Sequence, residues 1–228
     1  MPVTPASITT ASVTTTTLRL IRRGRTYFGG APATLVYLFA LLVTWLTLQG
    51  ADQRLTHQLI VSASTNVRNM RHDPVQVLIV SAFWIGQTAF PWVVVVEFLL
   101  VSVAAERWLG TVRWILTFIA GHVGATLITV TGIVYAVDHD MLKVRIERTE
   151  DVGYSYGMYA VVMAFTYRLR PPWRYAVAGG FFAWLGFLLW QGHTFTDYGH
   201  VCAAIIGFVS YPISNMVIAR WRPSPKSG

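Results

Sequence analysis

Charged residues are scarce in this chain. They make up 12% of its 228 residues, while hydrophobic residues make up 54%. Soluble domains carry about 25% charged residues, so this composition excludes an ordinary soluble domain. The single cysteine, Cys202, excludes an internal disulfide. Together with a mean hydropathy of +0.49, the composition indicates a polytopic membrane protein.

The histidines lack the spacing of metal ligands. His57, His72, His139 and His193 fall in predicted loops or at the ends of apolar segments, which argues against a zinc site. The chain also has no internal repeat and no sign of a second domain. We therefore expect one membrane domain, and nothing in the sequence implies a metal or a cofactor.

Six apolar segments approach or exceed the roughly 20 residues that cross a bilayer core. They predict an all-α fold with spans at about 29–49, 75–103, 111–137, 153–169, 173–190 and 198–219. The second segment is unusually long, and Pro91 inside it predicts a kink or a break. The predicted organisation is a disordered cytoplasmic tail, a six-helix membrane domain and a second cytoplasmic tail, at 1–28, 29–219 and 220–228.

Basic residues alternate between the two sides of these spans. One side holds 12 of the 18 Lys and Arg residues, in regions 19–25, 107–113, 168–174 and 220–226. The positive-inside rule places that side, with both termini, in the cytoplasm. The net charge of +8 is thus mainly an orientation signal. It favours a lipid bilayer over nucleic acid as the partner, and we expect a bacterial inner-membrane protein.

Two polar motifs begin the fourth and sixth spans. Ser155 lies in Gly153–Gly157 and His200 lies in Asp197–His200. Both spans start on the predicted outer side, so the serine and the histidine should lie at matching depth in one leaflet. A serine hydroxyl becomes a useful nucleophile when such a base takes its proton. The pattern therefore predicts a Ser-His dyad.

Helical spacing supports this pairing. Tyr159 follows Ser155 on the same stripe of its helix, where it should support the imidazole from one turn deeper. Below His200, the small residues Ala203 and Gly207 would let the two helix backbones approach closely.

The motifs resemble those of the rhomboid family of intramembrane serine proteases. The matching residues are Gly153, Ser155 and Tyr159 on one segment and Gly199, His200, Ala203 and Gly207 on another. Glu106–Gly110 is similar to the acidic turn that follows the family's second helix, and Ser81–Phe83 to the approach to that helix. The resemblance covers about 29–219 and implies a six-helix fold with Ser155 as nucleophile and His200 as base.

The chain departs from the family at the oxyanion hole. The family's two donors, a His and an Asn, correspond by count to Phe90 and Val94, which cannot donate side-chain hydrogen bonds. Tyr156 stands where the family has Gly directly after the nucleophile. Backbone N–H groups at Ser155 and Tyr156, at a helix N-terminus, could serve as donors instead.

Three further side chains have two interpretations each. Glu97 and His122 lie 13 residues before and 12 after Gly110, which predicts equal depth on neighbouring helices. They form either a polar pair that extends a cavity beside the dyad or a structural pair that satisfies two costly groups. Asp197 either orients His200 as a third catalytic member or caps the sixth helix.

These features give three functional hypotheses. The first is a serine endopeptidase that cuts single-span membrane substrates near their outer ends. The second is a rhomboid-like pseudoprotease that binds transmembrane helices as clients, which Phe90 and Val94 favour. The third is a small transporter or channel, for which only Glu97 and His122 offer a polar path.

Overall fold

The structure is a computed structural model that describes residues 22–86, 89–141, 152–192 and 194–221. It is helical, and the described residues include no β-strand. After a short helix at 22–28, the elements are α2 (Pro32–Gln49), α3 (Gln53–Ala63), α4 (Val67–His72), α5 (Pro74–Ser81), α6 (Trp92–Glu97), η1 (Phe98–Ser102), α7 (Val103–Leu109), α8 (Thr111–Asp138), α9 (Ser155–Phe165), η3 (Thr166–Arg168), α10 (Trp173–Gly192) and α11 (Phe195–Trp221).

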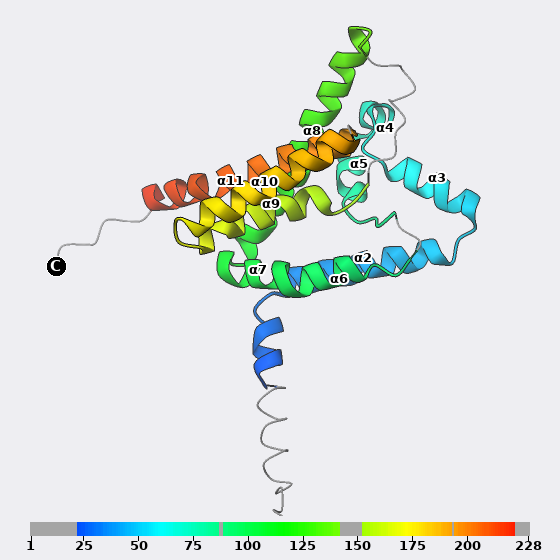
Figure 1. The fold of residues 1–228 in the computed structure, drawn as a ribbon. Helices are drawn as coiled ribbons and strands as arrows, with labels where there is room; N and C mark the ends of the chain where they lie inside the picture. Colours follow the sequence, from blue (N-terminus) through cyan, green and yellow to red (C-terminus); the bar gives the residue numbers. More distant parts are fainter. Residues whose placement is uncertain (1–21, 87–88, 142–151, 193, 222–228) are drawn as a thin grey trace, which may run out of the picture.

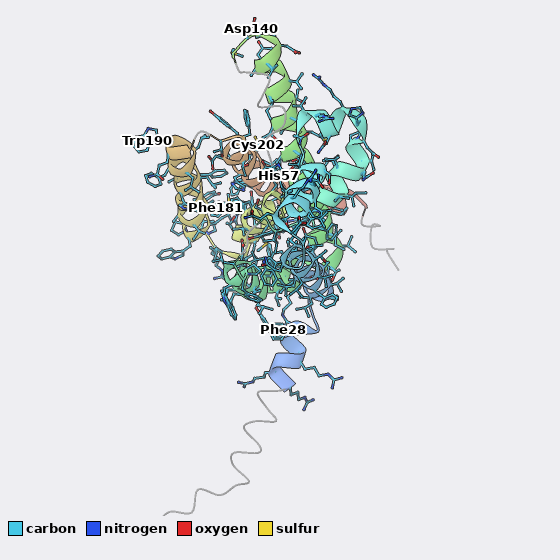
Figure 2. All side chains as sticks on the ribbon, turned by 90° about the vertical axis from the view of Figure 1, so that its right-hand side faces the viewer. Phe28, His57, Asp140, Phe181, Trp190 and Cys202 are labelled. Carbon is cyan, nitrogen blue, oxygen red and sulfur yellow. The ribbon has the colours of Figure 1, made fainter. Side chains whose placement is uncertain are left out.

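Figure 1 shows how these helices are arranged. Helices α9 and α11 run in the same direction and pack on each other and on α8, while α10 lies along α11. Helix α2 packs against the run from η1 to α7, α3 lies beyond the end of α2, and α4 packs with α5 beside α8. In Figure 2, Asp140, just after the end of α8, lies at the top of the molecule, and Phe28, at the end of the helix before α2, lies near its lower end.

Each predicted span coincides with a helical element, but the second one is two separate pieces. The segment predicted at 75–103 is interrupted, because α5 ends at Ser81 and helix resumes only at Trp92. Pro91 is the N-cap residue of α6, which confirms the predicted break there. From Trp92 the helix continues to Leu109 through a π-helical turn. Two helices in the described chain, α2 and α8, are by themselves long and apolar enough to cross a membrane.

Glycines set the distances between α8, α9 and α11. A Cβ atom on Gly207 would lie 2.1 Å from the carbonyl oxygen of Ala160, and one on Gly121 would lie 2.2 Å from the Cβ atom of Ala160. Ala160 is fully buried between the two neighbouring helices. Lipid tails are as apolar as these side chains, so close van der Waals contact, rather than exclusion from water, must hold such helices together.

Glu106 fastens α7 to the starts of α2 and α8. Its buried carboxylate accepts hydrogen bonds from the backbone N–H groups of Ala33 at 3.1 Å and Thr34 at 2.7 Å. It also accepts one from the Thr111 hydroxyl at 2.8 Å. Ala33 and Thr34 lie in the first turn of α2, where N–H groups lack intrahelical acceptors and the helix dipole favours an anion. The turn at Glu106–Gly110, which follows the second predicted span, therefore joins three helices through Glu106. We call these contacts the Glu106 clamp.

The neighbouring Arg107 orders the chain before α2. Its guanidinium donates to the carbonyl oxygens of Thr26 at 2.6 Å and Tyr27 at 2.8 Å, and it lies over the Tyr27 ring. The predicted disordered tail at 1–28 is therefore wrong for 22–28, which form a helix held by these contacts. Residues 1–21 and 222–228 of the two predicted tails lie outside the described residues.

The glycine contact at Gly207 gives a test of the packing. We expect Gly207→Ala to lower stability by about 1–3 kcal/mol, since the added Cβ overpacks the interface with Ala160. Gly186→Ala on α10 is the matched control, because its Cβ would meet nothing within 4 Å. Thermal unfolding of both variants in detergent measures the difference. Equal stability of the two variants would contradict this account of the interface.

Candidate active site

Ser155 and His200 meet at the starts of α9 and α11. His200 Nε2 lies 3.0 Å from Ser155 Oγ, and both side chains are partly buried. The structure therefore brings together the two residues of the predicted dyad. A nucleophile and a base in hydrogen-bond contact are the minimum that acyl transfer requires.

Gly153 determines where α9 begins. Its φ angle is +141°, a conformation that residues with a side chain rarely adopt. Its N–H group donates to the carbonyl oxygen of Ser81 at 2.9 Å, which ties the segment before α9 to the end of α5. The turn places Ser155 as the first residue of α9. An α-helix leaves the N–H groups of its first turn without intrahelical acceptors, so this end of α9 is suited to an oxyanion.

Two tyrosines hold the His200 ring. The Tyr159 ring lies against it with centroids 4.4 Å apart, one helical turn deeper than Ser155, as predicted. The Tyr156 ring meets it edge-on with centroids 5.4 Å apart. Tyr156 is buried because Gly199 makes room for it: a Cβ atom on Gly199 would lie 2.2 Å from the Tyr156 hydroxyl oxygen.

This side-chain role of Tyr156 was missed at the sequence level, where only its backbone was considered. The signal was the pairing of a bulky residue after the serine with a glycine before the histidine. A small residue at one position and a large one at the other fill the same space between α9 and α11.

Asp197 forms a capping box with Thr194 at the start of α11. Its carboxylate accepts from the Thr194 N–H group at 3.0 Å and from the Thr194 hydroxyl at 2.6 Å, and the Asp197 N–H group donates to the Thr194 hydroxyl oxygen at 3.2 Å. This arrangement satisfies first-turn donors of the helix. Asp197 thus belongs to the helix cap as the third residue of α11, and the N-cap residue is Thr194.

Glu97 and His122 have separate partners in place of the predicted pair. Glu97 accepts a hydrogen bond from the Tyr154 hydroxyl at 3.2 Å. His122 Nε2 lies 3.2 Å from Ser81 Oγ and 3.0 Å from the carbonyl oxygen of Leu78. His122 is buried and its ring is 6.4 Å from that of Tyr156, so it supports the site from behind. Glu97 lines a cavity that Ser155 also lines.

Phe90 and Val94, the counterparts of the family's oxyanion donors, pack away from the dyad. The Phe90 ring contacts Trp45 and Trp92, with centroids 5.2 Å and 4.5 Å away. Val94 is buried in the apolar core with Tyr37 and other residues of α2 and α8. Neither residue lines the space in front of Ser155.

A cavity of about 550 Å³ opens beside Ser155, between the α6–η1 run and α10. Its lining combines polar groups with aliphatic and aromatic walls: Trp92, Val93, Val96, Glu97, Leu100, Val101, Tyr154, Ser155, Tyr159, Phe181 and Trp184. Figure 2 shows Phe181 along α10, with the exposed Trp190 standing out from the molecule farther along the same helix. Within the described chain, no cluster of three or more His, Cys, Asp or Glu side chains could hold a metal ion.

Comparison with known proteins identifies the family. The family model described as rhomboid-like protein matches residues 26–219, which include the dyad and the Glu106 clamp. No curated protein and no solved structure matches the chain significantly. The family match and the two long apolar helices α2 and α8 together indicate a membrane protein. This chain belongs to the rhomboid-like protein family.

Proposed function

We propose that this protein is an intramembrane serine endopeptidase that cuts single-span membrane proteins near the outer leaflet. The observation that carries the proposal is the 3.0 Å contact between His200 Nε2 and Ser155 Oγ at the edge of an open cavity. A helix-capping serine needs no imidazole partner, and a structural histidine needs no cavity beside it. The combination favours catalysis.

The proposed reaction uses the contact between His200 and Ser155. His200 Nε2 takes the proton of the Ser155 hydroxyl as Oγ attacks the scissile carbonyl carbon. The oxyanion then collapses, the C–N bond breaks, and His200 gives its proton to the leaving amine. Water, deprotonated by His200, attacks the acyl ester and frees Ser155. The rings of Tyr156 and Tyr159 keep the imidazole of His200 in the same orientation during these steps.

Under this proposal, backbone N–H groups stabilise the oxyanion. Removing one oxyanion donor costs serine proteases about 100-fold to 1,000-fold in rate. With Phe90 and Val94 turned to other neighbours, the first turn of α9 supplies the donors and its dipole the favourable potential. We therefore expect a slow enzyme.

The membrane arrangement is also part of the proposal. We infer six passes, made by α2, the run from α6 to α7, α8, α9 with η3, α10 and α11, with both termini in the cytoplasm of a bacterial inner membrane. The excess of basic residues on one side supports this orientation. The dyad then faces the outer leaflet, and the cavity between α6 and α10 admits a substrate helix from the lipid.

A second candidate function is helix binding without cleavage. The apolar Phe90 and Val94 favour it, because they remove the family's side-chain donors. Under this alternative the same cavity binds the transmembrane helix of a client protein, and the Ser155–His200 contact has no catalytic role.

Labelling with a fluorophosphonate separates the two candidates. We expect the detergent-solubilised protein to be labelled, Ser155→Ala to lose all label, and His200→Ala to react about 100-fold to 10,000-fold more slowly, since the general base is gone. Ser210→Ala is the matched control, because that hydroxyl bonds within its own helix to the carbonyl oxygen of Gly207. A folded wild type without Ser155-dependent label would favour helix binding.

Because the Asp197 carboxylate bonds to Thr194 in the capping box, we predict that catalysis uses a Ser-His dyad without Asp197. Asp197→Ala and Thr194→Ala should each lower stability by about 1 kcal/mol, since each breaks the cap of α11. Their labelling rates should stay close to that of the wild type. A triad aspartate contributes on the order of 10,000-fold, so a loss of that size in Asp197→Ala alone would show that the carboxylate orients His200.

Reporter fusions test the orientation. A fluorescent protein fused to the C-terminus should fold and fluoresce in the cytoplasm, and alkaline phosphatase inserted between α8 and α9 should be active outside. The reverse pattern would place the dyad in the cytoplasmic leaflet and contradict the proposed site of cleavage.

A further inference from the structure

Glu97 faces the cavity beside Ser155 as the one carboxylate among its lining residues. The structure gives it a single hydrogen bond, from the Tyr154 hydroxyl at 3.2 Å. A carboxylate has about four acceptor sites, so among the described residues the bond from Tyr154 leaves most of its capacity unused. The side chain is partly buried, neither fully solvated nor sealed in the core.

The surroundings of Glu97 make this carboxylate costly. An ionised group inside a membrane is costly, and one hydrogen bond to a charged acceptor returns only part of that cost. The cavity walls are otherwise aliphatic and aromatic. A cation entering the cavity would therefore gain an ion pair in a medium that screens it weakly.

The aromatic wall suits the rest of such a side chain. Phe181, Trp184 and Tyr159 line the same cavity, with the Phe181 and Trp184 rings 5.5 Å apart and the Tyr159 ring 5.4 Å from Phe181. Lys and Arg carry long apolar stems that pack on such surfaces, and their charged ends are attracted to aromatic faces. One carboxylate and three aromatic rings together are suited to binding a basic side chain.

We propose that Glu97 determines substrate specificity by binding a Lys or Arg side chain of the substrate close to the bond that is cut. The inference rests on the proposed protease function and gives it a substrate class: single-span proteins with a basic residue near the outer end of the membrane segment. Glu97 and Ser155 line the same cavity, and Tyr154, which precedes Ser155 in the chain, donates to the Glu97 carboxylate. An extended substrate rises about 3.3 Å per residue, so the basic residue lies within about three positions of the scissile bond.

The test uses a model single-span substrate with Leu or Lys at each of these positions, in proteoliposomes with the full-length enzyme. At one position, Lys should raise kcat/KM over Leu by about tenfold or more with the wild type. Glu97→Gln should abolish this preference. Glu97→Lys should reverse it, so that a substrate with Glu at that position is cut faster than the Lys substrate. No preference at any position, or one that survives Glu97→Gln, overturns the proposal.

Binding separates this proposal from the proteolysis on which it rests. In the Ser155→Ala background, photo-cross-linking measures capture of the same Leu and Lys substrates without turnover, with and without Glu97→Gln. A Lys preference in capture that depends on Glu97, with no cleavage by the wild type, overturns the protease proposal and keeps the role of Glu97. Cleavage without a Lys preference overturns the role of Glu97 and keeps the protease proposal.

Discussion

The backbone contact between α9 and α11 is the constraint on which the candidate site depends. Gly207 lets the carbonyl oxygen of Ala160 approach to a distance that no side chain permits, and Gly199 makes the matching space for Tyr156. At this spacing the imidazole of His200 reaches the Ser155 hydroxyl across two parallel helices. Because lipid offers no hydrophobic drive for helix association, the small residues are what hold this geometry.

One part of the molecule is tightly packed, and another part contains a cavity. Glu106 joins α7 to α2 and α8 through three hydrogen bonds, and α8, α9 and α11 are joined by glycine contacts. Between the α6–η1 run and α10 there is instead a cavity with an exposed apolar rim. Under the proposed function, the tightly packed part keeps the dyad aligned while the cavity receives a substrate helix.

The sequence predicted the level of the dyad residues along their helices well. It predicted poorly the direction in which polar side chains point around the helix axis. Apolar length located the longer helices but not α3 and α4, Pro91 located the break, and helical rise predicted the level shared by Ser155 and His200. The same reasoning paired Glu97 with His122, but equal depth says nothing of the direction in which each side chain points around its helix. Glu97 turns to Tyr154, whereas His122 turns to Ser81 and Leu78. Asp197 does cap α11, as one of its two interpretations predicted, but from the third helical position, because the capping box depends on where the first helical turn begins, which apolar periodicity does not fix.

The central claim is that helix contact through Gly207 assembles the Ser155–His200 dyad. The most direct test is the rate at which a fluorophosphonate modifies Ser155, followed by mass spectrometry, in the wild type and in a folded Gly207→Val variant. The account predicts that the adduct maps to Ser155 in the wild type and forms at least about 100-fold more slowly in the variant, because the parted helices withdraw the base. A Gly207→Val variant that keeps its helical structure and is modified at the wild-type rate would contradict the claim.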